Sequence, residues 1–231
     1  PLRPYMMCPL YCINNMYIDE FDIYEDRDDE KNRQAGFAFV RFLHTSPNTP
    51  PVDIYIDDRK AVSNLTYASM AGYAALPSTL QKITVYPTGD TRQPLLTFTI
   101  NPAQNSFRTI VIAGLSPSIQ YRTYIDSHEI IPTNESRFRF VHLAPGAPSV
   151  DVVTETGQQL LSGVTFGRMA DYINISPDIY RFRLRIAGTP NEILALPEIT
   201  LSGGRAYTIY AIGLLGGMPP LTAVMVTDGR R

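Results

Sequence analysis

The fold is decided by a stretch that occurs twice: residues 42–55 read F-L-H-T-S-P-N-T-P-P-V-D-I-Y, and residues 140–153 read F-V-H-L-A-P-G-A-P-S-V-D-V-V. The histidine, two prolines and a Val-Asp pair align without a gap at an offset of 98 residues. Two later blocks keep almost the same spacing, since residues 67–73 match 166–172 and the run starting at Ile83 matches the run starting at Phe182. Agreement over several blocks at one spacing indicates an internal repeat.

A repeat of this length is too long for a solenoid unit and is typical of a β-sandwich domain. Each copy consists of short runs rich in β-branched and aromatic residues, separated by turn signals, and no run has convincing helical periodicity. We therefore predict an all-β chain with two tandem β-sandwich domains, at residues 37–132 and 133–231, behind an extended N-terminal arm of residues 1–36.

The arm differs in composition from both repeats. Eight of the 22 acidic residues lie between Asp19 and Glu30. An acidic run is normally solvated, but the apolar residues of the arm are too numerous for a simple disordered tail, so we expect it to bind a partner surface. The residues that we assign to this assembly segment are Cys8, Tyr11, Cys12, Tyr17, Phe21 and Tyr24.

The only two cysteines, Cys8 and Cys12, both lie in the arm. A C-x3-C spacing without a second pair is poor support for a zinc site, and we expect neither metal nor cofactor. Three states stay open for the two thiols: reduced, linked to each other, or linked to another subunit.

Composition excludes some functions and leaves the location open. A net charge of −2 argues against general nucleic-acid binding, which needs a basic surface. No apolar run approaches the roughly 18 residues of a membrane span. The sequence begins at Pro1 rather than Met, so the lack of a visible leader does not indicate the cytosol.

The repeated loops supply the most obvious polar residues, namely His44, Pro47, Asp53, His142, Pro145 and Asp151. In a functional interpretation each histidine is a base oriented by the aspartate, or both are metal ligands. In a structural interpretation they hydrogen-bond backbone groups that the proline-rich loop cannot pair in a ladder. Ser46 becomes Ala144 in the second copy, which counts against a shared Ser-His-Asp mechanism.

One strand of the second repeat alternates strictly. Between Tyr180 and Ile186, alternate positions are apolar and should face the core, while Arg181, Arg183 and Arg185 should form a ladder on the other face. This ladder is either a binding face for an anionic glycan or an acidic partner segment, or an ordinary solvated strand face.

The two block patterns, His-x-Ser/Ala-Pro-x-x-Pro-x-Val-Asp-Val and Tyr/Phe-Gly/Ala-x-Met/Val-x-x-Tyr, resemble a bacterial and archaeal family catalogued as domain of unknown function 4397. The residues that carry the resemblance are His44, Pro47, Pro50, Val52, Asp53, Tyr67, Tyr73, His142, Pro145, Pro148, Val150, Asp151, Phe166 and Tyr172. The resemblance implies an immunoglobulin-like or transthyretin-like β-sandwich, and we expect two tandem immunoglobulin-like domains. It also implies a secreted or surface-attached protein, and it brings no activity.

We accordingly expect a non-enzymatic structural surface protein. Its subunits would self-assemble through the arm, by strand addition or intersubunit disulfides, into a fibre, appendage or coat layer outside the cell or on a cell or spore surface. The spore is suggested by the arm, whose composition is similar to tails of proteins from spore-forming Gram-positive bacteria. The alternative is a surface adhesin or carbohydrate-binding module with a glycan or host protein as partner.

Overall fold

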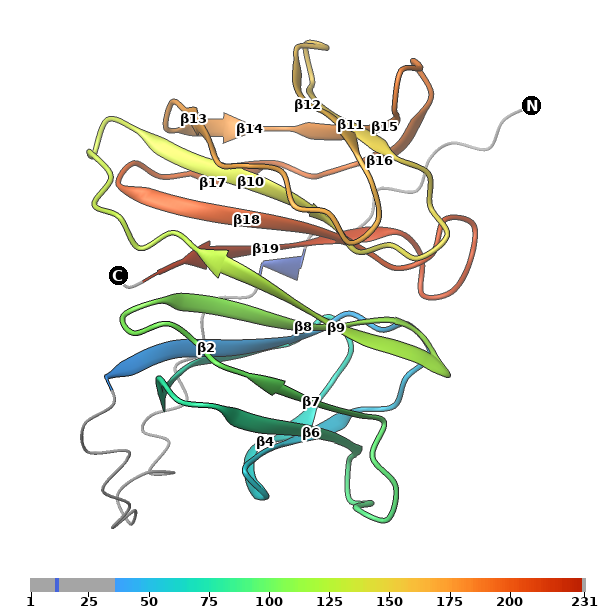
Figure 1. Cartoon of the computed structure of the whole chain (residues 1–231). Helices are drawn as coiled ribbons and strands as arrows, with labels where there is room; N and C mark the ends of the chain where they lie inside the picture. Colours follow the sequence, from blue (N-terminus) through green and yellow to red (C-terminus); the bar gives the residue numbers. More distant parts are fainter. Residues whose placement is uncertain (1–10, 13–35, 230–231) are drawn as a thin grey trace. The chain divides into compact units, whose positions relative to one another are not determined.

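The computed structural model describes residues 11–12 and 36–229, and every regular element within them is a strand. These residues form two compact units (Figure 1). The first repeat comprises residues 36–128, and the second comprises residues 129–229 together with the short strand β1 (Tyr11–Cys12). The predicted all-β class is confirmed. No helix in the described ranges is long and apolar enough to cross a membrane.

The first repeat is a sandwich of two four-stranded sheets. Its strands in chain order are β2 (Phe37–His44), β3 (Val52–Ile56), β4 (Arg59–Leu65), β5 (Met70–Pro77), β6 (Gln81–Pro87), β7 (Leu96–Ile100), β8 (Phe107–Leu115) and β9 (Ser118–Asp126). One sheet has the order β5-β2-β8-β9 and the other β4-β3-β6-β7. These pairings are antiparallel except that of β2 with β8, which is parallel.

The core of the first repeat lies between its two sheets. Val40 and Phe42 of β2 and Ile110 of β8 pack against Ile54 of β3 and Ile83 of β6, and none of the five is more than 2% exposed. They occupy alternate positions of their strands because successive side chains point to opposite faces of a sheet. Full burial of each such side chain stabilises the fold by about 1.5–3 kcal/mol.

The second repeat contains the same two sheets with additions. Its strands are β10 (Ser136–His142), β11 (Val150–Thr154), β12 (Gln159–Val164), β13 (Ile173–Ile175), β14 (Asp178–Tyr180), β15 (Phe182–Ile186), β16 (Glu192–Ala195), β17 (Ile199–Leu201), β18 (Arg205–Ile212) and β19 (Thr222–Asp228). The sheets have the orders β1-β19-β18-β10-β13, β12-β11-β15-β16 and β14-β17. As in the first repeat, the parallel pair at the centre joins the first strand, β10, to the penultimate one, β18.

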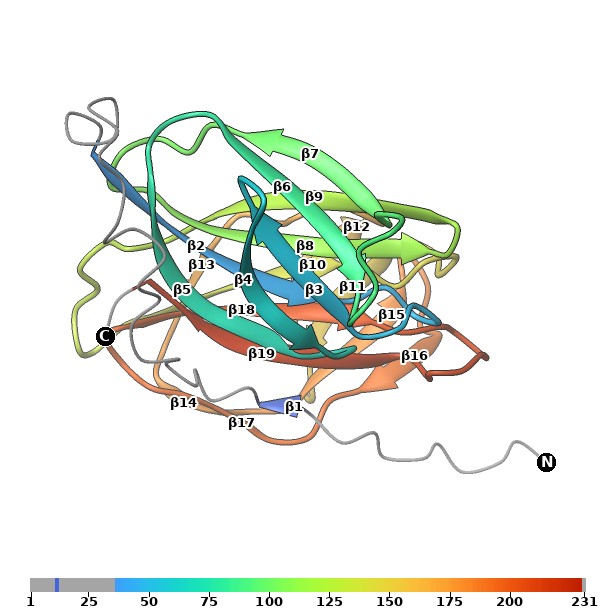
Figure 2. The ribbon, with the colours of Figure 1, turned by 90° about the horizontal axis from the view of Figure 1, so that it is seen from below.

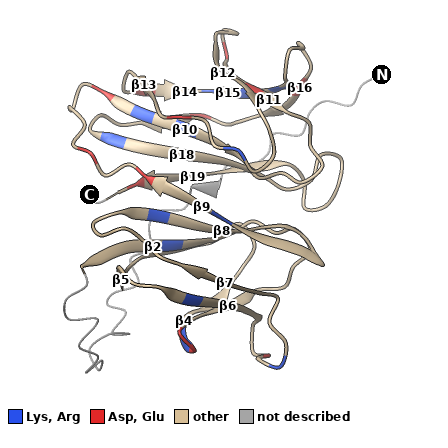
Figure 3. Ribbon diagram, viewed as in Figure 1, with Lys and Arg blue, Asp and Glu red and all other residues tan. Residues whose placement is uncertain are grey.

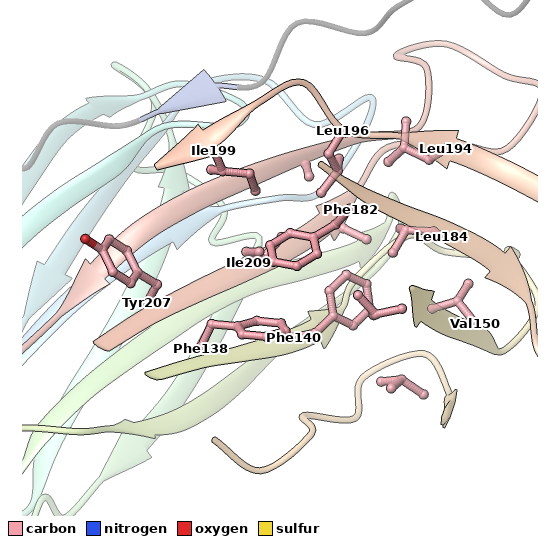
Figure 4. Packing of buried hydrophobic residues seen from close by; sticks show 14 of the residues in the cluster. Phe138, Phe140, Val150, Phe182, Leu184, Leu194, Leu196, Ile199, Tyr207 and Ile209 are labelled. Atoms are coloured by element: carbon pink, nitrogen blue, oxygen red, sulfur yellow. The ribbon is translucent and has the colours of Figure 1, made fainter. Parts of the chain in front are cut away.

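The core of the second repeat is aromatic at its centre (Figure 4). Phe138 of β10 stacks on Phe182 of β15 with ring centroids 5.0 Å apart. Phe140, Leu184 and Ile209 complete this centre, and all five side chains are fully buried. The two sheets are therefore joined by direct packing between β10 and β15.

The strand order corrects one part of the expected fold. In the immunoglobulin order, the first two strands of the domain are neighbours in one sheet. Here β2 and β3 lie in different sheets, and so do β10 and β11. The two sandwiches are present, but the immunoglobulin-like arrangement does not describe their connections.

The alternating run of the second repeat is two strands rather than one. β14 ends at Tyr180 and pairs with β17, whereas β15 begins at Phe182 and pairs with β11 and β16. The chain thus changes sheets at Arg181. Phe182 is fully buried as predicted, but Ile186 at the far end is only partly buried, and it lies outside the core.

Candidate functional site

A segment of the arm adds a strand to the second repeat. β1 runs parallel to β19, with Tyr11 opposite Val224 and Cys12 opposite Met225 (Figure 2). β19 pairs on its other side with β18 along its whole length. Strand addition of this kind uses the unpaired main-chain groups of a sheet edge, so it needs little side-chain complementarity. The other predicted assembly residues, Cys8, Tyr17, Phe21 and Tyr24, lie outside the described residues.

The predicted loop histidine of the first repeat bonds to its own loop. His44 is fully buried and meets the ring of Tyr67 edge to face. Its Nδ1 accepts the backbone N–H of Ser46 at 3.3 Å, so the ring proton is on Nε2, which donates to the carbonyl of Pro50 at 3.2 Å. Both ring nitrogens are therefore occupied by the backbone.

The hydroxyl of the neighbouring serine is also used in hydrogen bonds within the fold. Ser46 donates its hydroxyl proton to the carbonyl of Gly114 at 2.7 Å, and its oxygen lies 2.7 Å from the hydroxyl of Thr49. A nucleophilic serine needs its hydroxyl hydrogen-bonded to the base. Ser46 contacts His44 through its backbone N–H instead.

The second repeat reproduces the histidine geometry. His142 accepts the N–H of Ala144 at 3.3 Å and donates to the carbonyl of Pro148 at 3.0 Å. Burial lowers the pKa of both His44 and His142, and the hydrogen bond to the proline carbonyl offsets only part of that effect. Both rings are consequently neutral at pH 7.

The loop aspartate of the first repeat clamps two left-handed residues. Asp53 accepts the N–H of Asn64 at 2.9 Å and that of Gly89 at 3.3 Å, and these residues have φ values of 53° and 79°. Lys60 adds an ion pair at 2.7 Å. Burial alone raises the pKa of Asp53, but the hydrogen bonds from Lys60 and the two amides outweigh it and lower the pKa to about 2.

The second aspartate forms the same clamp without the cation. Asp151 accepts the N–H of Gly163 at 2.8 Å and that of Gly188 at 2.9 Å, and both glycines have positive φ. Gln159 stands where the first repeat has Lys60. In both repeats the histidine and the aspartate of the loop thus hold the backbone in place by hydrogen bonds to different amide groups.

The match with a protein family covers these same loops. A family model described as "Domain of unknown function (DUF4397)" matches residues 38–153. The chain belongs to this family. The match begins in β2, covers the first repeat and ends in β11, so it contains both copies of the His-Pro-Asp loop.

Other comparisons add little to the DUF4397 match. No curated protein matches the sequence. Among solved structures the chain is similar to the Bacillus anthracis TIE protein, at 12% identity and a TM-score of 0.24, covering 78% of this chain and 33% of that one. It is also similar to a structure titled "Alpha-glucan binding by a streptococcal virulence factor", at 9% identity and a TM-score of 0.24, covering 80% and 96%. The chain thus spans about a third of the TIE protein, and TM-scores of this size do not establish a shared fold.

Both repeats contain a buried polar network that the sequence did not single out. In the first repeat Arg41 donates through Nε to the hydroxyl of Thr109 at 2.7 Å, and Thr109 donates to Asp126 at 2.6 Å. Tyr73 donates to the same carboxylate at 2.7 Å, and its ring lies 4.5 Å from the guanidinium. The four residues come from β2, β8, β9 and β5, so this quartet crosses the whole sheet.

The second repeat contains the equivalent quartet. Arg139 donates to Thr208 at 2.7 Å, Thr208 donates to Asp228, and Tyr172 donates to Asp228 at 2.6 Å while its ring lies 4.5 Å from the guanidinium. Arg41 and Arg139 are both fully buried. A signal existed in the sequence, because each arginine immediately precedes the phenylalanine that opens the repeated block. The quartets end at the last residues of β9 and β19, and so they hold the edge strands in place.

The outward faces of the other sheets differ between the repeats. In the first repeat the rings of Tyr55 and Tyr86 meet edge to face at 5.3 Å, and Nζ of Lys60 lies 5.6 Å from the Tyr55 ring. In the second repeat this face carries the predicted arginine ladder. We call the first the tyrosine face.

Two arginines of the predicted ladder, Arg181 and Arg183, form ion pairs within the chain. Arg181 pairs with Glu155 at 3.1 Å and with Glu198, and Arg183 pairs with Glu192 at 3.2 Å. Basic and acidic residues therefore lie side by side around β15 (Figure 3). The described residues contain no group of three or more His, Cys, Asp or Glu side chains that could hold a metal ion.

Proposed function

We propose that this DUF4397 chain is a non-enzymatic structural protein of the cell or spore surface, whose subunits assemble by strand addition of the arm. The observation that carries the proposal is the parallel pairing of β1 with the edge strand β19. When an equivalent contact joins different copies and does not close into a ring, it generates a filament. A fibre, appendage or coat layer is the resulting structure.

The arm has the reach that this assembly needs. In the sequence, 24 residues separate Cys12 from Phe37. An extended chain of that length spans up to roughly 80 Å. The strand Tyr11–Cys12 can therefore reach the β19 edge of its own chain or that of another copy.

The polar loops support a role without catalysis. The ring nitrogens of both histidines are bonded to backbone groups, and both aspartates are bonded to backbone amides. A general base needs a free lone pair within reach of a substrate proton. Replacing His44 and His142 together is accordingly expected to impair folding rather than turnover.

A register-specific disulfide tests the assembly. Cys12 lies opposite Met225, and a disulfide needs Cα atoms within about 7 Å. In a Cys8→Ser background, Met225→Cys should therefore trap the β1 strand on β19 under oxidising conditions. The matched control, Met225→Ser, provides no thiol at that place.

The readout is a non-reducing gel together with sedimentation. Covalent multimers that collapse on reduction, and loss of non-covalent multimers when residues 1–36 are deleted, are expected for assembly between copies. A protein that stays monomeric at high concentration with and without the arm, and forms only an intrachain bond, contradicts the proposal.

A second candidate is a surface adhesin or carbohydrate-binding module. The tyrosine face favours it, because aromatic rings beside a cation are typical contacts for polar ligands. Saturable binding on a glycan array by the protein lacking residues 1–36, abolished by Tyr55→Ala or Tyr86→Ala, would support this function. If no glycan on the array binds, the result argues against a carbohydrate-binding function and favours assembly.

A further inference from the structure

The two repeats present equivalent edge strands. β9 pairs antiparallel with β8 as β19 pairs with β18, and each is the last strand of its repeat. The register places Arg122 opposite Val111 and Val224 opposite Tyr210. Because Val111 and Tyr210 are equivalent at an offset of 99, Arg122 and Thr123 in β9 correspond to Val224 and Met225 in β19. These last two residues are the ones that β1 pairs with.

The edge of β9 is built like the edge that already accepts a strand. β9 is the terminal strand of the order β5-β2-β8-β9, it is nine residues long, and it lies next to β8 along its whole length. Every second residue of an edge strand directs its main-chain groups away from the sheet. The Arg41 quartet fixes the far end of β9 at Asp126 as the Arg139 quartet fixes β19 at Asp228.

We infer that β9, along residues 118–123, is a second acceptor edge for the Tyr11–Cys12 strand of another copy. This inference rests on the proposed function, because it uses the same donor strand. Each chain then offers one donor and two acceptors, so copies can join at either repeat.

Main-chain pairing and charge both favour this occupant. Strand addition depends on backbone hydrogen bonds, so the change from Val224 to Arg122 does not remove the pairing surface. It adds a positive charge, and the donor arm carries eight acidic residues between Asp19 and Glu30. Opposite charges on donor and acceptor favour the correct encounter and register more than they raise affinity.

The equivalent disulfide tests this edge. In the full chain with Cys8→Ser, Thr123→Cys should form a disulfide with Cys12, whereas Ser118→Cys on the same strand is out of register. A mixture of ¹⁵N-labelled and unlabelled protein is oxidised, and the linked peptides are identified by mass spectrometry. Heavy–light peptides joining Cys12 to the new thiol should be several-fold more abundant for Thr123→Cys than for Ser118→Cys.

The result separates this inference from the proposed function. Equal yields at the two β9 positions, or links confined to heavy–heavy and light–light peptides, overturn the second acceptor edge. The Met225→Cys protein is analysed in parallel. If it forms interchain links while Thr123→Cys does not, assembly through β19 stands alone, and the reverse outcome leaves β9 as the acceptor and rejects β19.

Discussion

The Asp53 clamp gives a prediction whose size follows from the structure. Asp53→Asn removes a buried carboxylate that accepts two backbone amides and the ammonium of Lys60. The pKa of Asp53 falls from the ordinary 3.8 to about 2 in the fold, and a change of that size corresponds to about 2.4 kcal/mol. Lys60 is 42% exposed, so solvent screens part of the interaction, and we expect a loss of about 1–2 kcal/mol at pH 7.

The direction of the Asp53 pKa shift determines how the stability of the fold changes with pH. A carboxylate whose pKa is lowered by folding stabilises the fold above its unfolded pKa, and that contribution disappears as the pH falls through the folded value. The difference in unfolding free energy between wild type and Asp53→Asn should therefore be constant from pH 7 to 5 and shrink between about pH 4 and 2. Urea titrations at several pH values measure it.

A matched control uses another aspartate–lysine pair of the same repeat. Asp58 pairs with Lys82 at 3.0 Å, but the Asp58 side chain is 76% exposed. Asp58→Asn should leave the urea midpoint almost unchanged, because exposed ion pairs contribute little. If Asp58→Asn and Asp53→Asn are equally destabilising, or if the Asp53→Asn difference persists unchanged at pH 2, the clamp reasoning is wrong.

Three further predictions concern the repeated sites. Arg41→Met should cost about 3–5 kcal/mol in urea unfolding, because the fully buried Asp126, 3.4 Å from the Arg41 guanidinium, is left without its cation. Arg41→Met with Asp126→Leu should recover much of this loss, and a single variant as stable as wild type refutes the role of the quartet. Because burial lowers the pKa of both His44 and His142, stability should fall as the pH drops below their ordinary value of 6.5. His44→Asn and His142→Asn, made singly, should each reduce this pH dependence, and an unchanged dependence in both variants shows that other groups cause it. Gly188→Ala should lower the free energy of unfolding by about 1–2 kcal/mol, because Gly188 has a φ of 73°. No atom lies within 4 Å of an added Cβ, so the backbone conformation alone causes this loss, and an unchanged melting temperature contradicts the prediction.

The repeat made the two sandwiches predictable from sequence. Local patterns were sufficient there, since β-prone runs and turn signals recur at a fixed offset in both copies. The quartets were not predictable in the same way, because their members, such as Arg41 and Asp126, lie far apart in the sequence and meet only when the strands pair. The alignment of Arg41 with Arg139 carried a hint, but a lone arginine in a strand usually indicates a solvated face.

Two other features depended on tertiary context. The alternation from Tyr180 to Ile186 is compatible with one strand, and only pairing with two different sheets breaks it at Arg181. The glutamates that neutralise Arg181 and Arg183 come from neighbouring parts of the fold, so their arrangement was not visible in a single strand. The pairing of β1 with β19 involves two residues, too few to leave a periodic signal.

The quartets also bear on how a duplicated domain diverges. Both copies retain the same arginine, threonine, aspartate and tyrosine across one sheet, while the opposite sheets have drifted to tyrosines with a lysine in one copy and to arginines with glutamates in the other. Each quartet lies wholly within one repeat, so it can stabilise the sheet of that repeat whatever residues the outer face of the opposite sheet carries. The outer faces of the two repeats can therefore change independently. Exchanging outer-face residues between the two copies should move the surface chemistry from one repeat to the other and leave both folds intact.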